Sequence, residues 1–126
     1  GSDGSVRVWS LTKMAPIHRL AAHDNSVTSL QFDKTRIVSG GSDGRVKVWN
    51  LQTGQLLREL STPAEAVWRV AFEDEKAVIM ASRSGRTVME VRDVPFYGNM
   101  FSNIYRRSGL SLHHQKTTMI QPLRVL

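Results

Sequence analysis

The chain has 126 residues, 40% of them hydrophobic, and a formal net charge of +6. It contains no cysteine, which excludes a disulfide framework and a thiolate metal site. No apolar run approaches the roughly 20 residues of a membrane span, and no signal peptide opens the sequence. We therefore expect no membrane association and a location in the nucleus or cytoplasm. Residues 1–94 carry 13 basic and 11 acidic side chains, and residues 95–126 carry four basic and none acidic, so the basic character belongs to the C-terminal part.

Two stretches of the sequence repeat one another. GSDGSVRVW at residues 1–9 reappears as GSDGRVKVW at residues 41–49, so that Asp3 and Asp43, and likewise Trp9 and Trp49, are 40 positions apart. The Gly-Ser-Asp-Gly segment predicts a turn, and the alternating valines after it predict a half-buried strand. A period of about 40–45 residues with a turn Asp and a strand Trp is the signature of a WD-repeat propeller blade.

In chain order, the pattern predicts strands of three successive blades. The first blade has its third and outer strands at residues 5–9 and 17–21 and lacks the first two. The second has inner, second, third and outer strands at 26–32, 36–40, 45–51 and 55–60, and the third has strands at 66–72, 76–82 and 87–94. Pro95 ends the pattern because proline cannot donate to a strand ladder. The sequence thus predicts an all-β, incomplete β-propeller fragment, about two four-stranded WD blades plus a partial one, with an irregular tail.

The predicted domain boundary follows from this pattern. Residues 1–94 are expected to be the C-terminal WD-repeat blades of a longer propeller, since closed propellers have roughly four to eight blades. Residues 95–126 show no repeat, and we expect a basic, mostly disordered tail with at most a short helix near 118–125.

Four polar side chains of the second blade look at first like a catalytic set: His23, Ser39, Asp43 and Trp49. In WD repeats these positions form a chain of hydrogen bonds from indole to hydroxyl, hydroxyl to imidazole and imidazole to the turn carboxylate. Each such bond contributes about 0.5–1.5 kcal/mol, and losing one partner leaves a buried polar group unsatisfied. We interpret the set as structural and expect no enzymatic activity.

The third unit has lost this set. Pro63 stands at the position of His23, Ser84 replaces the turn Asp, and Glu90 is expected where the Trp would be. Atypical terminal units are usual in repeat arrays, so the third unit is expected to be the last blade.

Four successive segments of the sequence resemble the C-terminal blades of F-box/WD-repeat proteins. In chain order they are HDNSVTSLQF, RIVSGGSDGRVKVWNLQTGQLLREL, AEAVWRVAF and AVIMASRSGRTVMEV. They are most similar to the fungal cell division control protein 4 group, the substrate receptors of SCF ubiquitin ligases, over about residues 1–92. The resemblance implies binding of phosphorylated substrate peptides on the top face of the propeller. Adaptor and cullin would bind only through an upstream F-box, which this sequence does not contain. The alternative is a WD-repeat scaffold in signalling, transcription or RNA processing.

Four residues are candidates for partner contact at the top face. Thr28 and Trp68 occupy equivalent inner-strand positions, and Ser42 and Arg83 flank the turns between second and third strands. Trp68 offers an apolar surface for a Pro or Leu of an extended peptide, with a core Trp as the alternative. Arg83 would receive phosphate, with a solvated turn Arg as the alternative.

The tail offers only weak signals. His113 and His114 are adjacent and lack a third ligand nearby, so we expect no metal and no cofactor. Arg106, Arg107, Lys116 and Arg124 spread four charges over 32 residues, with Phe96, Tyr97, Phe101 and Tyr105 interleaved. This density is too low to favour a nucleic acid partner.

Overall fold

The computed structural model describes residues 3–94 and 118–122, and in them the chain is all-β. The strands are β1 (Ser5–Ser10), β2 (Ala15–Ala21), β3 (Val27–Phe32), β4 (Arg36–Gly41), β5 (Val46–Asn50), β6 (Leu56–Glu59), β7 (Ala66–Glu73), β8 (Lys76–Arg83), β9 (Arg86–Asp93) and β10 (Thr118–Pro122). Within these described ranges, no helix is long and apolar enough to cross a membrane.

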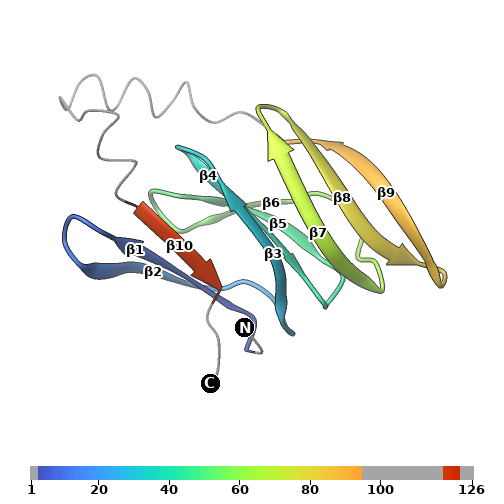
Figure 1. Cartoon of the computed structure of the whole chain (residues 1–126), viewed down its shortest axis with the longest axis horizontal. Helices are drawn as coiled ribbons and strands as arrows, with labels where there is room; N and C mark the ends of the chain where they lie inside the picture. The colour runs from blue at the N-terminus through green and yellow to red at the C-terminus, as the bar shows by residue number, and fades with distance from the viewer. Residues whose placement is uncertain (1–2, 95–117, 123–126) are drawn as a thin grey trace.

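The strands form three antiparallel sheets that stand side by side (Figure 1). The middle sheet has the order β3-β4-β5-β6, the first has β10-β1-β2 and the third has β7-β8-β9. The predicted fold class, an open all-β propeller fragment, is confirmed. The strand count differs in one respect, because only the middle sheet has four strands among the described residues. The third sheet has three strands, β7, β8 and β9, the number predicted for residues 66–94.

The prediction of a short helix near 118–125 is wrong for residues 118–122. These residues form β10, which pairs antiparallel with β1. Residues 118–122 lie along the edge of β1 opposite to β2, so a long-range pairing and not a local helix propensity determines their conformation. Residues 95–117 and 123–126 lie outside the described part, so the disorder and the domain boundary expected there stay predictions.

Apolar side chains fill the spaces between the three sheets. Those between the first and the middle sheet include Val6, Val8, Leu20, Ile37 and Trp49. Those between the middle and the third sheet include Val38, Val46, Val48, Val67, Val70 and Ile79. The alternation of inward and outward residues along each strand therefore gives the middle sheet two buried faces, whereas each outer sheet has one.

Polar side chains of β3 bind the backbone of β7 along this second interface. The Ser29 hydroxyl accepts a hydrogen bond from Val70 N at 3.0 Å and lies 3.2 Å from Val70 O. Gln31 Oε1 accepts from Phe72 N at 3.2 Å. Because β3 and β7 belong to different sheets, these bonds fix how far one blade is shifted along the next.

Arg36 adds a second polar connection between these sheets. Its side chain is fully buried, although arginine is almost never so unless it is paired. It donates to Asp33 Oδ2 at 3.0 Å and to Val94 O at 3.2 Å, and its guanidinium lies 4.9 Å from the centre of the Phe72 ring. The start of β4 is thereby joined to the residue that follows β9.

Two glycines allow the repeat to join one blade to the next. Gly4 and Gly44 are 40 positions apart and have φ angles of 73° and 83°. A Cβ at either position would lie within 2 Å of a backbone oxygen, that of His23 or of Ala64. The carbonyls of the same glycines accept hydrogen bonds from His23 N and Ala64 N, both at 2.9 Å. The turn before each third strand is therefore packed against the loop that leads into the following blade.

Removing the Ser29 hydroxyl should weaken the interface between the middle and third sheets. Ser29→Ala leaves Val70 N without its acceptor, so we expect the free energy of unfolding to fall by about 1–3 kcal/mol. Urea unfolding followed by tryptophan fluorescence measures this change. Ser61→Ala, in the loop between β6 and β7, is the matched control and should change stability by less than about 0.5 kcal/mol. Equal stability of the two variants would contradict the assigned role of Ser29.

Candidate functional site

The four polar residues singled out in the second blade are joined in one chain of hydrogen bonds. Trp49 Nε1 donates to Ser39 Oγ at 3.0 Å, and Ser39 Oγ lies 2.9 Å from His23 Nε2. His23 Nδ1 lies 3.0 and 3.2 Å from the two carboxylate oxygens of Asp43. With Nδ1 protonated, the imidazole donates to Asp43 and accepts from Ser39, so each of these contacts has a donor and an acceptor. The order of contacts is the one expected from the sequence.

Burial and the backbone determine the ionisation of the central pair. Burial lowers the pKa of His23 below 6.5, and this effect outweighs the opposing attraction of Asp43. Burial alone would raise the pKa of Asp43, but hydrogen bonds from Asp24 N and Arg45 N, together with His23, hold that pKa below 3.8. A neutral imidazole beside a carboxylate that accepts backbone N–H groups is a way of holding a loop against a turn.

The third sheet has replaced this set with other residues. Leu51 and Val94 are equivalent residues of the second blade and the third sheet. Leu51 N donates to Thr35 O and Val94 N donates to Glu75 O, and each acceptor is the residue before the second strand of its sheet. Counting back two positions puts Arg92 at the place of Trp49, so the expectation for Glu90 is wrong. The cause is a longer hairpin: the paired residues Gly40 and Val46 are six positions apart, and the corresponding Met80 and Met89 are nine apart.

In the third sheet, Glu65 makes hydrogen bonds that replace part of the missing His23–Asp43 connection. Its carboxylate accepts hydrogen bonds from Gly85 N at 3.0 Å and from the Ser82 hydroxyl at 3.1 Å. It therefore attaches the loop that enters β7 to the hairpin between β8 and β9. The corresponding attachment in the second blade is the bond between His23 and Asp43. The sequence analysis missed Glu65 because its two partners are not residues of the WD motif.

Thr28 and Trp68 occupy equivalent β-bulges. The register of β3 on β4 shifts between Val27 and Ser29, and that of β7 on β8 shifts between Val67 and Arg69. A bulge directs a side chain away from the regular alternation of the strand. The Thr28 hydroxyl lies 2.6 Å from Val67 O, and the Trp68 side chain is 51% exposed. The alternative that Trp68 is a core residue does not hold for the described part of the chain.

Ser42 and Arg83 lie at the same ends of their sheets as Thr28 and Trp68, but their side chains are engaged. The Ser42 hydroxyl donates to Ser26 O at 3.4 Å, and the Ser42 backbone N–H donates to the same oxygen at 2.9 Å. Arg83 pairs with Glu90 and donates to Thr62 O at 2.7 Å and to Pro63 O at 3.3 Å. Arg83 would have to give up these bonds to receive a phosphate.

Arg69 is a candidate that the sequence analysis missed. It follows Trp68 in the bulge and is exposed, and its guanidinium makes no ion pair or hydrogen bond with the described residues. The only signal in the sequence was its place next to Trp68. Its counterpart 40 positions earlier, Ser29, faces the neighbouring sheet, and Arg69 is exposed because no sheet covers that face of β7 among the described residues. Trp68 and Arg69 together present an aromatic surface beside an unpaired positive charge, and we call them the rim pair.

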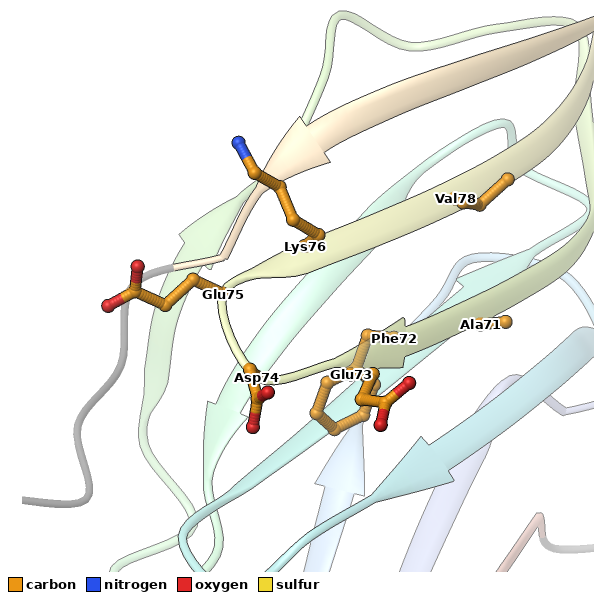
Figure 2. A pocket seen from close by; sticks show the side chains of 7 residues that line it. All are labelled: Ala71, Phe72, Glu73, Asp74, Glu75, Lys76 and Val78. Carbon is orange, nitrogen blue, oxygen red and sulfur yellow. The ribbon is translucent and has the colours of Figure 1, made fainter.

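A hollow of about 810 Å³ lies at the other end of β7, around its turn into β8 (Figure 2). It is lined by Ala71, Phe72, Glu73, Asp74, Glu75, Lys76 and Val78. Figure 2 shows that its three carboxylates point in different directions. No group of His, Asp or Glu in residues 3–94 is arranged to hold a metal ion. His113 and His114 lie outside the described residues.

Comparisons with known proteins agree with this geometry. Residues 14–50 match the family of the WD domain, G-beta repeat. The crystal structure of the computationally designed Ika4 protein is 32% identical, covering 75% of this chain and 57% of that one, with a TM-score of 0.66. The designed Ika8 protein is 34% identical over 72% of this chain and 28% of its own, with a TM-score of 0.64.

A natural propeller has the same fold at lower identity. The β-propeller domain of Myceliophteria thermophila Cps50 (Swd1) is 22% identical over 71% of this chain and 33% of its own, with a TM-score of 0.56. This chain thus spans 57% or less of the length of each of these three solved structures. No curated protein sequence matches it. The chain thus contains a match to the WD domain at residues 14–50 and has the fold of β-propeller fragments, and both findings support a WD-repeat protein.

Proposed function

We propose that this chain forms part of a propeller that binds an extended, phosphorylated segment of a partner protein at the strand ends around Trp68. The match to the WD domain favours a role in protein–protein interaction for this chain. The finer assignment, a phosphodegron-binding substrate receptor of an SCF-type ubiquitin ligase in ubiquitin-dependent degradation, is supported by the resemblance to F-box/WD-repeat proteins. In that assembly the adaptor and cullin bind through an F-box upstream of the blades.

The exposure of Thr28 is the observation that carries this proposal. Thr28 is exposed even though both faces of its sheet are covered, one by the first sheet and one by the third. Trp68 is its counterpart in the next blade, in the same kind of bulge. A further blade stacked on the third sheet would therefore leave the side chain at position 68 accessible. An accessible Trp is the residue type most enriched among the energetic centres of interfaces.

The rim pair also supports a phosphorylated partner. Within residues 3–94 the donors of Arg69 are not used by another residue and could bind a phosphate, whereas those of Arg83 are used by Glu90 and two carbonyls. A guanidinium binds phosphate through paired hydrogen bonds. We therefore transfer the phosphate-binding role expected of Arg83 to Arg69.

The proposal includes neither catalysis nor a cofactor. The polar groups that resemble a catalytic set bind one another, and Ser39, the only nucleophile among them, is fully buried. A binding role in the nucleus or cytoplasm accords with the lack of cysteine in the sequence.

Truncating Trp68 should weaken peptide binding without unfolding the protein. Trp68→Ala is expected to cost about 2 kcal/mol or more of binding free energy, measured by titration calorimetry on the propeller that contains this chain. Met89→Ala is the matched control, because Met89 is a large exposed side chain of the same sheet but lies in β9. If both variants lower the melting temperature alike and neither changes affinity, Trp68 is a contact between blades.

Two arginine variants separate phosphate recognition from structure. Arg69→Ala should reduce the preference for a phosphorylated peptide over its unphosphorylated form by about 10-fold or more, as expected for the loss of a charge-assisted hydrogen bond. Its melting temperature should stay unchanged. Arg83→Ala should lower the melting temperature, because Glu90 loses its partner. If Arg83→Ala removes the preference for the phosphorylated peptide and Arg69→Ala does not, Arg83 binds the phosphate. If the unmodified protein does not prefer the phosphorylated peptide, the alternative of a different WD-repeat scaffold is favoured.

The structural role of His23 predicts a pH dependence. Because the pKa of His23 is lowered on folding, the unfolded chain binds the proton more readily. The contribution of His23 to stability is therefore complete above about pH 6.5 and is lost as the pH falls from there through the folded pKa, with a limiting slope of about 1.4 kcal/mol per pH unit. The pKa of Asp43 is also lowered, and its contribution is lost only below about pH 3.8.

His23→Gln tests this assignment. Urea unfolding should show the variant less stable by about 1–3 kcal/mol at pH 8, with a flatter profile between about pH 8 and pH 5. Loss of peptide binding by a variant that keeps its stability would place His23 in a functional site.

A further inference from the structure

The loop between β6 and β7 differs from its counterpart between β2 and β3. In the earlier loop Ala22 and His23 are 0% and 6% exposed, and both backbone N–H groups donate to the turn glycine before β1. Thr62 and Pro63, 40 positions later, are exposed. Because Pro63 has no N–H, the bond to the turn glycine of the next blade is made one residue later, by Ala64 N at 2.9 Å. Thr62 and Pro63 therefore lie outside the packed part of their loop.

The backbone around Thr62 is held only at the two ends of the loop. Leu60 N donates to Val46 O at 3.0 Å, and Ala64 N makes the bond to the turn glycine. Among the described residues, the N–H groups of Ser61 and Thr62 and the Thr62 hydroxyl make no hydrogen bond. A short exposed segment with so few backbone bonds opens locally with a small change in free energy. The Thr62 hydroxyl is thus accessible to an enzyme that binds the loop.

Thr62 is also the only Ser or Thr of the whole sequence that precedes a proline. The four prolines follow Ala15, Thr62, Val94 and Gln121. The residue before a proline favours an extended backbone, which is the conformation in which a substrate segment lies in the cleft of a protein kinase. Proline-directed kinases select a Ser or Thr hydroxyl by the proline after it. The chain therefore contains one sequence of this kind, and it lies in an exposed loop.

Two arginines lie beside this loop. Arg83 Nη2 donates to Thr62 O at 2.7 Å and its Nη1 to Pro63 O at 3.3 Å. Its Nε donates to Glu90, so these bonds use three of the five N–H donors of the guanidinium and leave two. Arg86 lies opposite Arg83 in the β8–β9 hairpin, is exposed and has no ion pair among the described residues. Opposite residues of an antiparallel pair share a face, so Arg86 is on the side of the sheet on which Arg83 contacts the loop.

We propose that Thr62 is a phosphorylation site for a proline-directed protein kinase and that its phosphate pairs with Arg83 and Arg86. Thr62 Oγ1 forms a bond to the γ-phosphorus of the Mg²⁺-bound ATP held by the kinase, and the bond from that phosphorus to the β,γ-bridging oxygen breaks. The hydroxyl proton goes to a base of the kinase, and ADP leaves. The phosphate brings about −1.5 to −2 charges and three acceptor oxygens to the two guanidinium groups. It thereby fastens the β6–β7 loop to the β8–β9 hairpin.

Phosphorylation of the full chain tests the site. Incubated with a purified proline-directed kinase, Mg²⁺ and ATP, the chain should take up phosphate at Thr62, located by mass spectrometry. Thr62→Ala and Pro63→Ala should take up none, although Pro63→Ala keeps the hydroxyl. Ser61→Ala is the matched control and should be phosphorylated like the unmodified chain.

The rate of phosphorylation shows whether the folded protein presents Thr62. It should lie within about 100-fold of the rate for the free peptide RELSTPAEAV, residues 58–67, because only the loop has to open. A site reached only through global unfolding would be slower than the peptide by about 1,000-fold or more.

The melting temperature of the phosphorylated chain tests the pairing with arginine. Phosphorylation should raise it by about 4 °C or more, as expected for new charge-assisted hydrogen bonds. The rise should be lost in Arg83→Ala and reduced in Arg86→Ala. Arg92→Ala is the matched control, because Arg92 also pairs with Glu90 but makes no bond to the loop, so the rise should stay the same.

Three outcomes would overturn the proposal. A phosphorylation rate below the stated range, or no uptake by the folded chain, would mean that the folded protein does not present Thr62. Uptake by Pro63→Ala equal to that of the unmodified chain would mean that the proline does not direct the kinase. A melting temperature that phosphorylation leaves unchanged or lowers, or a rise that persists in both Arg83→Ala and Arg86→Ala, would mean that these arginines do not bind the phosphate.

Discussion

The stacking of one twisted sheet on the next is the interaction on which this structure depends. Each strand alternates residues between two faces, and the middle sheet buries both faces only because a neighbouring sheet covers each one. The valines of β4, β5 and β7 supply the apolar area, and Ser29 and Gln31 fix the position of one sheet on the next through the backbone of β7. Apolar contact alone is not directional, so these few polar bonds determine the alignment from which the positions of the bulges and turns follow.

The hydrogen-bonded set of His23, Ser39, Asp43 and Trp49 acts within this stack as a connection between a loop and a turn. It is complete in the second blade, where every polar atom has a partner. The first sheet keeps the turn carboxylate of Asp3, which accepts from Ser5 N, and the indole of Trp9. The third sheet replaces the set with Glu65 and with the pairing of Arg83 and Glu90. A complete polar network stabilises a blade, whereas a partial one leaves a buried group unsatisfied, as at Trp9 Nε1, which has no hydrogen-bond partner among the described residues.

The repeat made most of the fold predictable from the sequence. Strand positions followed from a 40-residue offset and from alternating apolar residues, because a strand buried on one face must alternate in this way. The spacing from the turn residue failed where the chain lengths differ. The hairpin from Met80 to Met89 is longer than its counterpart, so counting from Ser84 as from Asp43 gave Glu90 for the position that Arg92 occupies. The bulge at Trp68 had no sequence signal beyond its register with Thr28. The pairing of residues 118–122 with β1 was not predictable either, because it is a long-range contact that has no signal in the local sequence.

The outer face of the third sheet and the strand ends around Trp68 differ in what they are suited to bind. Val78, Met89 and Val91 on that face are exposed and apolar, which is the character of a surface that stacks against another sheet. The rim pair instead combines an indole with a guanidinium that has no partner among the described residues, and Trp and Arg are both enriched among the energetic centres of interfaces. Stacking covers the faces of a sheet but not the ends of its strands, as the exposed Thr28 shows in the sheet that is covered on both sides. The same repeat can therefore extend the propeller through its faces while it presents successive bulge residues to a peptide along its rim.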